Sequence, residues 1–229
     1  MTPGHIDWTA VGVSVRLGLV VAVLLGIIGI PIAWWLTFRR RRWTFLLDAI
    51  VALPLVLPPT VLGYYLLVGL GARSPFGRAW EHWTGHPFAF TFDALVVASL
   101  LYSLPFVVQP IAASFAQVDR VLLEAAATLG ASPWRRFVRI VLPLSVDGIM
   151  AGMVLAFAHT IGEFGVVLMV GGNIPGVTRT VSVAIFDQVQ FFDFSGAAAT
   201  AFLLLVSSFA TLATVYALRR RAVGAGPFA

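Results

Sequence analysis

The sequence predicts an all-α integral membrane protein with about five transmembrane helices. Of its 229 residues, 59% are hydrophobic and 11% are charged, which is too apolar for a soluble domain. Several apolar runs reach about 20 residues, the length that an α-helix needs to cross the hydrocarbon core of a bilayer. We therefore expect a single transmembrane domain over residues 1–229.

The composition excludes several kinds of site. The chain has no cysteine, so it cannot form disulfides or thiolate metal sites. Its basic side chains are all arginines, whereas a phosphate-binding P-loop requires a lysine. Hydrolysis of a nucleotide by such a loop would therefore come from another chain. The arginines lie beside apolar runs, where they set membrane topology, and do not indicate a nucleic-acid partner.

The first span is predicted over Val11–Leu36 and is followed by the consecutive arginines Arg39–Arg42. Clustered arginine at the end of a span marks the cytoplasmic side of the membrane. Such a cluster can also contact anionic lipid headgroups, and the two roles are compatible. The N-terminus is therefore expected on the outer side.

The second span, Leu47–Leu70, contains Pro54, Pro58 and Pro59 in the stretch LPLVLPP. Proline removes a backbone donor, so we expect this helix to break inside the membrane. Irregular backbone at that depth is tolerated only against other protein or a water-filled cavity. The second span is therefore predicted to line a path through the membrane, and a packed kink is the alternative.

An external loop and a third span are expected next. The loop covers residues 71–92, where His82 and His86 have no acidic cluster beside them. They are predicted to be plain loop residues rather than metal ligands. The third span, Phe92–Phe115, leads to a polar and basic segment at residues 119–143.

The C-terminal part is predicted to contain two further spans. In the fourth, Ser145–Val170, Gly148 and Gly152 have the spacing that favours close helix packing. Residues 180–193 are too short and polar to cross, so we expect a helix on the outer surface or dipping partway in. A sixth span would require this segment to cross. The last span covers residues 194–218.

The arginines fall unequally on the two sides of this topology. The cytoplasmic group is Arg39–Arg42, Arg120, Arg135, Arg136, Arg139 and Arg219–Arg221, and the outer group is Arg73, Arg78 and Arg179. This asymmetry predicts a cytoplasmic C-terminus.

The segment 119–143 is predicted to form a helix–turn–helix. Asp119 can cap a first helix that runs through Leu129, and Gly130 supplies the left-handed residue that ends it. Ser132 and the proline after it can restart a helix. Pro143 is expected to stop that second helix, because it cannot donate the next hydrogen bond.

The same segment carries a spaced pattern, E-A-A-x3-G-x9-I-x-L-P, that begins at Glu124 and ends at Pro143. Ala125 and Ala126 have small side chains, so another protein could approach this surface closely. A hairpin at the membrane interface that binds no partner would have the same sequence features. The pattern resembles the EAA loop of permease subunits of bacterial ABC importers.

One pair of ionisable residues lies in the fourth span. His159 and Glu163 are four apart, so we expect them on one helical face within the membrane. The chain has no HExxH or GxSxG pattern, and an integral membrane enzyme is only a remote alternative. We predict that Glu163 hydrogen-bonds within the bundle and helps to hold a gate, with His159 as its partner.

Further stretches sharpen the resemblance. They are IGEFG at 161–165, GNIPG at 172–176, AIFD at 184–187 and the proline-rich LPLVLPPTVLGYYLL. Together they resemble the permease subunits of molybdate (or tungstate) ABC importers. They are also similar to the related sulfate permeases. A sulfate, thiosulfate or other oxyanion permease is therefore the alternative within this class.

The resemblance implies a type I ABC importer (MetI-like) permease fold in the bacterial inner membrane, with a periplasmic N-terminus. It also implies a homodimer, two ATPase subunits that bind ATP and Mg, a periplasmic molybdate-binding protein and surrounding lipid. No cofactor, metal or catalytic residue is expected in this chain. Transport would proceed by alternating access, with cargo selected by the binding protein.

The resemblance implies a set of coupling residues, and together with the broken second span and the intramembrane Glu163 it indicates a set of pathway residues. The expected ATPase-coupling residues are Glu124, Ala125, Ala126, Leu129, Gly130, Arg135, Ile140 and Pro143. The expected pathway or gate residues are Pro54, Pro58, Pro59, Thr60, Glu163, Phe164 and Asn173.

Overall fold

The computed structural model describes residues 5–38 and 43–224, with residues 214–224 as backbone only. Every regular element in these ranges is helical, as predicted. Arg39–Arg42, from which the topology is predicted, lie outside the described residues, as do the side chains of Arg219–Arg221. The elements are α1 Trp8–Phe38, α2 Thr44–Val56, α3 Pro59–Leu70, α4 Pro75–Thr84, α5 Phe92–Ala116, α6 Arg120–Thr128, α7 Pro133–Arg136, the π-helical turn Phe137–Val141, α8 Leu142–Leu144, α9 Val146–Gly162, α10 Gly165–Gly171, α11 Val181–Gln190 and α12 Phe194–Gly224.

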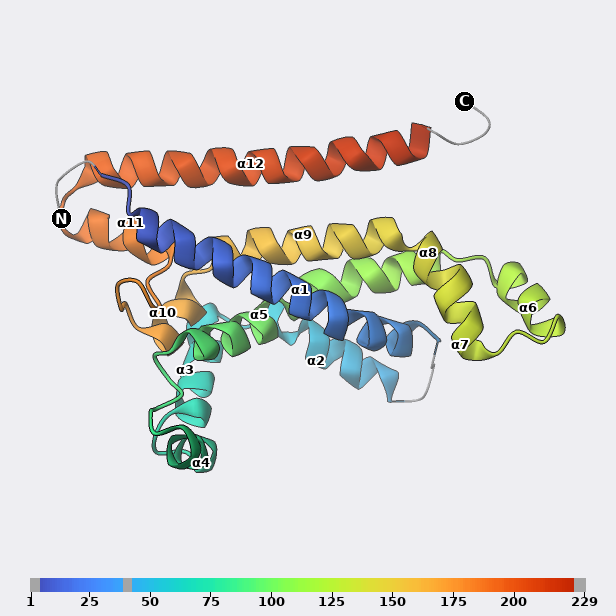
Figure 1. The fold of residues 1–229 in the computed structure, drawn as a ribbon, viewed down its shortest axis with the longest axis horizontal. Coiled ribbons are helices and arrows are strands. Elements are labelled where there is room, and N and C mark those ends of the chain that lie inside the picture. Colours follow the sequence, from blue (N-terminus) through green and yellow to red (C-terminus); the bar gives the residue numbers. More distant parts are fainter. Residues whose placement is uncertain (1–4, 39–42, 225–229) are drawn as a thin grey trace.

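Three long helices, α1, α5 and α9, pack together at the centre of the molecule (Figure 1). Leu17 and Leu25 of α1 and Val107 and Ile111 of α5 are fully buried in one apolar cluster. These helices are apolar around most of their circumference, which is typical of segments buried in a membrane protein. α12 lies beside α11 and α9 along the edge of this bundle (Figure 1).

Small residues bring the central helices close together. A Cβ atom on Gly29 would lie 2.7 Å from Cγ1 of Val107, and one on Gly152 would lie 3.0 Å from the carbonyl oxygen of Val107. A Cβ atom on Gly148 would overlap Ser114. Side chains cannot approach so closely, so α1 and α9 contact α5 only because these positions are glycine. The close packing predicted for Gly148 and Gly152 is confirmed.

The predicted break in the second span is confirmed. α2 and α3 meet at 109° around Leu57 and Pro58. Pro54 lies inside α2, whereas Pro59 is the first residue of α3, where the missing N–H has no helical partner to lose.

The number of spans agrees with the expectation of about five. Among the described residues, three helices are long and apolar enough to cross a membrane: Trp8–Phe38, Phe92–Ala116 and Phe194–Ala213. Two bent pairs, α2 with α3 and Pro133–Leu144 with α9, bring the number to five if each pair is one span. α11 has 10 residues, which is too short for a sixth span.

Two predicted boundaries were wrong. The expected external loop at 71–92 contains α4, which Ser74 caps by accepting a hydrogen bond from the N–H of Gly77 at 2.8 Å. The expected fourth span does not continue to Val170, because the backbone becomes extended at Glu163 and α10 begins separately. Both boundaries were predicted from the average composition of the stretch. In both places a capping side chain next to glycine starts a separate helix instead.

Candidate functional site

The EAA segment, residues 119–143, projects from one end of the bundle (Figure 1). Asp119 Oδ1 accepts a hydrogen bond from the N–H two residues on at 2.8 Å and begins α6. Gly130 follows with φ 79°, a left-handed conformation that favours glycine. Ser132 Oγ accepts from the N–H three residues on at 3.3 Å, and Pro133 opens α7. The helix–turn–helix predicted from these residues is confirmed.

The outer surface of the EAA segment mixes apolar and charged side chains. Leu129 is 88% exposed and Trp134 is 71% exposed. Glu124, Ala125 and Arg135 are exposed beside them. Large apolar side chains rimmed by charge are typical of a surface that binds another protein. Of the other predicted docking residues, Gly130 and Pro143 are exposed and Ala126 and Ile140 are half-buried.

A buried aromatic residue anchors the EAA segment to the bundle. Phe137 packs edge-on against Trp34 of α1, with ring centroids 4.6 Å apart, and against Phe115 of α5 at 6.0 Å. The guanidinium of Arg136 donates to the carbonyl oxygen of Leu123 at 3.4 Å, which ties α7 to α6. A movement of α6 and α7 would therefore be transmitted to α1 and α5.

Pro143 does not end the second helix, and that prediction was wrong. The chain forms a π-helical turn at Phe137–Val141, in which the N–H of Leu142 bonds to the carbonyl oxygen of Phe137. The helix then continues through Pro143 to Leu144 before it bends by 68° into α9. The wider turn changes the hydrogen-bond register just before the proline, so the missing donor does not stop the helix there.

A second group of predicted residues meets at the other end of the bundle. α3 and α10 lie side by side and begin at the same level, because a Cβ atom on Gly165 would lie 2.7 Å from Cβ of Pro59. Gly63 of α3 packs equally closely on Met169 of α10. The two breaks in the helices therefore adjoin. They bring together Pro58, Pro59, Thr60, Glu163 and Phe164, and they leave out Pro54 and Asn173.

The side chain of Glu163 caps the start of α10 from the position before the N-cap residue, Phe164. Its Oε1 accepts a hydrogen bond from the N–H of Val166 at 2.8 Å, and the residue is 8% exposed. Its backbone carbonyl accepts from Ser182 Oγ of α11 at 2.9 Å, and the same hydroxyl reaches the carbonyl oxygen of Ile161 at 3.1 Å. A carboxylate at a helix N-terminus is stabilised by the helix dipole. The prediction that Glu163 hydrogen-bonds within the bundle is confirmed.

His159 is not the partner of Glu163, and that prediction was wrong. α9 ends at Gly162, so Glu163 leaves the helical face on which His159 lies. Nδ1 of His159 is 2.9 Å from Oγ of Ser103 on α5. The pairing is between two helices, which a spacing of four residues cannot reveal. Among the described residues there is also no group of three ionisable side chains that could hold a metal ion.

Asn173 belongs to a polar clasp, formed by Asp7, Asn173, Arg179 and Asp187. Arg179 Nε donates to Asn173 Oδ1 at 2.7 Å, and the Asn173 amide donates to Asp187 Oδ2 at 2.5 Å. The Arg179 guanidinium is 3.2 Å from Asp187 and 3.7 Å from Asp7. The clasp fastens the loop after α10 to α11 and to the chain before α1. Sequence reasoning missed it because its members are separated along the chain.

The comparisons with known proteins agree with this geometry. Residues 26–224 match the model of the family described as binding-protein-dependent transport system inner membrane component. The chain belongs to this family. It is thus a multi-pass component of an inner-membrane transport system, and the alternative of an integral membrane enzyme is set aside.

Relatives of this permease chain cover most of its length. It is 47% identical to the molybdenum transport system permease protein ModB of Azotobacter vinelandii over 218 residues, which are 95% of this chain and 96% of that one. It is 41% identical to ModB of Escherichia coli strain K12 over 80% of each chain. The sulfate transport system permease protein CysT of the same strain is 34% identical over 88% of this chain and 73% of its own length.

The fold of the permease also matches solved structures. The crystal structure of a bacterial alginate ABC transporter, in complex with its pentasaccharide-bound periplasmic protein, contains a chain that aligns with a TM-score of 0.76. The alignment covers 93% of this permease and 78% of that chain at 16% identity. The expected type I importer fold is therefore confirmed.

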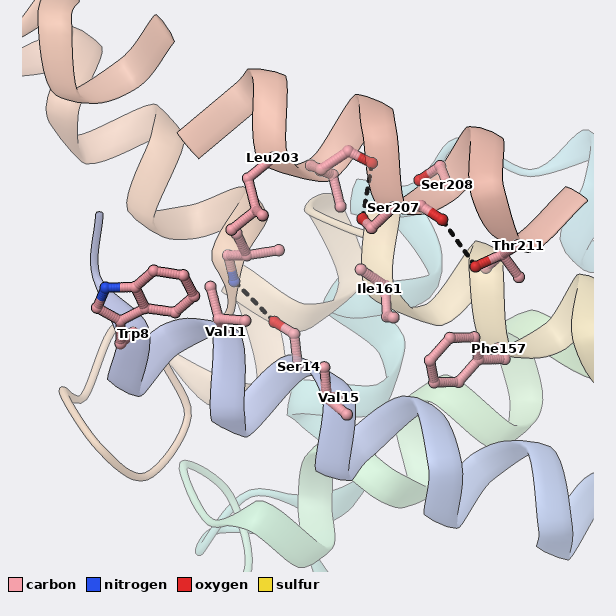
Figure 2. A pocket seen from close by; sticks show the side chains of 13 residues that line it. Trp8, Val11, Ser14, Val15, Phe157, Ile161, Leu203, Ser207, Ser208 and Thr211 are labelled. Atoms are coloured by element: carbon pink, nitrogen blue, oxygen red, sulfur yellow. Dashed lines mark hydrogen bonds between the residues drawn. The ribbon is translucent and has the colours of Figure 1, made fainter. Parts of the chain in front are cut away.

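An apolar hollow also lies between α1, α9 and α12 of the permease. Figure 2 shows Trp8 and Val15 of α1, Phe157 of α9 and Leu203 of α12 around it. Its volume is about 290 Å³. Ser14 at its edge accepts a hydrogen bond from the N–H of Val181 at 2.8 Å. Hydrocarbon suits this lining and a charged solute does not, so the hollow is no part of an anion path.

Proposed function

We propose that this chain is the membrane-spanning permease subunit of an ATP-driven importer of molybdate. The observation that carries the proposal is the 47% identity to ModB of Azotobacter vinelandii, because it extends over 95% of this chain and includes both the EAA segment and the adjoining helix breaks. Sulfate permeases share the family but are less similar, at 34% identity for CysT. An importer of sulfate, thiosulfate or another oxyanion is the second candidate.

The EAA segment docks into a separate ATPase subunit, which binds ATP and Mg. Three features support this role: the exposed Leu129 and Trp134, the charges of Glu124 and Arg135 beside them, and the anchoring of Phe137 in the bundle. The first two provide an interface, and the third provides a rigid link to α1 and α5. The full set of proposed coupling residues is Glu124, Ala125, Ala126, Leu129, Gly130, Arg135, Ile140 and Pro143.

The working assembly is a homodimer of permease subunits with two ATPase subunits and a periplasmic binding protein. The EAA segment lies on the cytoplasmic side, together with the C-terminus. The N-terminus is then periplasmic, because the start of α1 lies at the end of the bundle opposite α6 and α7, as does α11 (Figure 1). Lipid surrounds the apolar faces, of which exposed Phe202 and Phe209 of α12 are examples.

Transport proceeds by alternating access. ATP binding brings the two ATPase subunits together, and the EAA segments move with them. The paired permeases open outward and receive the anion from the binding protein, and hydrolysis returns the path to its inward state. The adjoining breaks at Pro58 and Glu163 are the gate, because short half-helices can move at a break without loss of internal hydrogen bonds. The binding protein selects the cargo.

The proposal is tested by reconstituting the permease in liposomes with its ATPase and binding protein. ATP hydrolysis and uptake would be measured with molybdate, tungstate or sulfate added one at a time. Stimulation by molybdate or tungstate supports the proposal, and the two anions are compared by titration. Stimulation by sulfate alone supports the second candidate function, import of sulfate or a related oxyanion. Stimulation by none of them, with the ATPase still bound, overturns the choice of cargo.

A further inference from the structure

Polar side chains line one face of the central helices at a distance from both the EAA segment and the clasp. Tyr102 and Gln109 lie on α5, and His159 lies on α9. We call these three residues the donor face. Gln109 is exposed, and neither its amide nor the hydroxyl of Tyr102 has a hydrogen-bond partner among the described residues.

The three side chains form a continuous strip. Tyr102, Phe106 and Gln109 are four and three residues apart, so they share one side of α5. The ring of His159 stacks on Phe106 with centroids 4.0 Å apart, and it lies 5.1 Å from the ring of Tyr102. Its Nδ1 is engaged by Ser103, which fixes the orientation of the ring and leaves Nε2 without a partner in the described chain.

A hollow follows the strip toward the EAA end. It is about 330 Å³ in volume and open to the outside of the single chain. It lies between three helices, and its lining residues include Leu55 of α2, Phe106, Gln109 and Ala113 of α5 and Leu155 of α9. Within the described part of the chain, the only side-chain amide in this lining is that of Gln109.

Contact with lipid tails is unfavourable for the amide of Gln109. It lies about 17 residues into α5, which is about 25 Å along the helix and within the hydrocarbon depth of a spanning segment. An unpaired amide at that depth costs several kcal/mol in lipid, so such groups face water or other protein. α5 therefore turns this side toward a water-filled path or toward the second permease subunit.

We propose that the donor face contacts the oxyanion as it crosses the membrane. This inference rests on the proposed function. A tetrahedral oxyanion accepts hydrogen bonds at every oxygen, and an amide and a phenol can donate them without a full positive charge. The imidazole of His159 donates from Nε2 in the tautomer in which Ser103 donates to Nδ1. α2, α5 and α9 contain no arginine or lysine, so nothing on these helices would hold a dianion tightly. Passage requires entry without trapping, and weak neutral donors satisfy that requirement.

The test replaces Gln109 in the complete reconstituted transporter and measures molybdate uptake at saturating loaded binding protein. In Gln109→Glu a negative charge repels the anion, and we expect uptake to fall at least about tenfold. In Gln109→Leu the donor is lost, and we expect a fall of about three- to tenfold. Gln109→Asn keeps an amide and should restore most of the uptake. Gln190→Leu removes an exposed amide from α11 and serves as the matched control.

Three outcomes overturn the inference. The first is normal uptake by the Gln109→Glu transporter. The second is equal loss in all three Gln109 variants, which indicates packing rather than donation. The third is loss of uptake together with loss of the homodimer, measured by the mass of the purified complex, because the second subunit would then cover this face. If the unmodified transporter takes up no molybdate, the proposed function fails instead.

Discussion

The two ends of the bundle are built in opposite ways. At one end, the EAA segment exposes Leu129 and Trp134 and is tied back by a single aromatic anchor, Phe137. At the other end, the clasp buries Arg179 between two carboxylates and an amide, with side chains that are 13% exposed for Arg179 and 12% for Asp187. Both ends are short helices joined by glycine-containing turns.

The two ends of the bundle are therefore suited to different tasks. A segment whose apolar side chains remain exposed needs a partner to cover them, so its stability depends on an assembly. A segment whose polar groups are satisfied within the chain holds its shape alone. We therefore expect substitutions at the EAA end to change coupling with little effect on folding, and those at the clasp to do the reverse.

The largest effect is expected from Gly130→Pro. Proline holds φ near about −65°, whereas Gly130 has φ 79°, so the turn between α6 and α7 cannot form. We expect molybdate uptake to fall at least about tenfold, while the protein still inserts into the membrane. Gly85 has φ 78° at the end of α4, and Gly85→Pro is the matched control. Normal uptake by the Gly130→Pro transporter would count against the docking role.

A smaller effect on coupling is expected from Glu124→Ala. This residue is exposed on α6, and its charge can contribute only through a partner. We expect stimulation of ATP hydrolysis by the loaded binding protein to fall about fivefold. Glu81→Ala, on the exposed surface of α4, should leave the stimulation unchanged. Equal effects of the two substitutions would contradict a specific role for Glu124.

At the clasp, Asp187→Ala should affect stability rather than coupling. It leaves Arg179 with the amide oxygen of Asn173 and with Asp7, a carboxylate 3.7 Å away, and it removes the acceptor of the Asn173 amide. We expect the free energy of unfolding to fall by about 2–4 kcal/mol, measured by denaturation in detergent. In a double-mutant cycle with Arg179→Ala the two losses should not add. Additive losses would show that the two residues act independently.

The smallest effect is expected from Ser14→Ala. This change leaves the N–H of Val181 buried without its acceptor, and we expect a loss of about 1–2 kcal/mol in the free energy of unfolding. Ser207→Ala is the control, because that hydroxyl bonds only to the carbonyl of Leu204 within its own helix. If both variants unfold alike, the link between α1 and α11 contributes nothing.

Sequence reasoning was accurate where the physical cause is local. Asp119, Gly130 and Ser132 act on backbone within three residues, so the order of residues along the chain is enough to predict the helix–turn–helix. The break at Pro58 follows from the chemistry of proline alone. The number of spans follows from the length of the apolar runs.

Two features were missed because their cause lies far away in the chain. Ser103 and His159 are 56 residues apart, and no pattern around either residue indicates the other. The clasp joins Asp7 to Arg179 across almost the whole chain. α4 was missed for a different reason: its cap at Ser74 and its terminal Gly85 are visible in the sequence, but its mixed composition suggested a loop.

The π-helical turn at Phe137–Val141 takes up one extra residue between the EAA segment and α9 within a single turn of helix. Deleting one residue from this turn would restore an ordinary helix and leave α6 and α7 close to their present direction. Each residue of a regular α-helix advances the chain by about 100° around the axis, so a deletion from α9 would instead rotate α6 and α7 by that angle. The direction in which the permease presents its coupling surface is therefore encoded in chain length as well as in side chains.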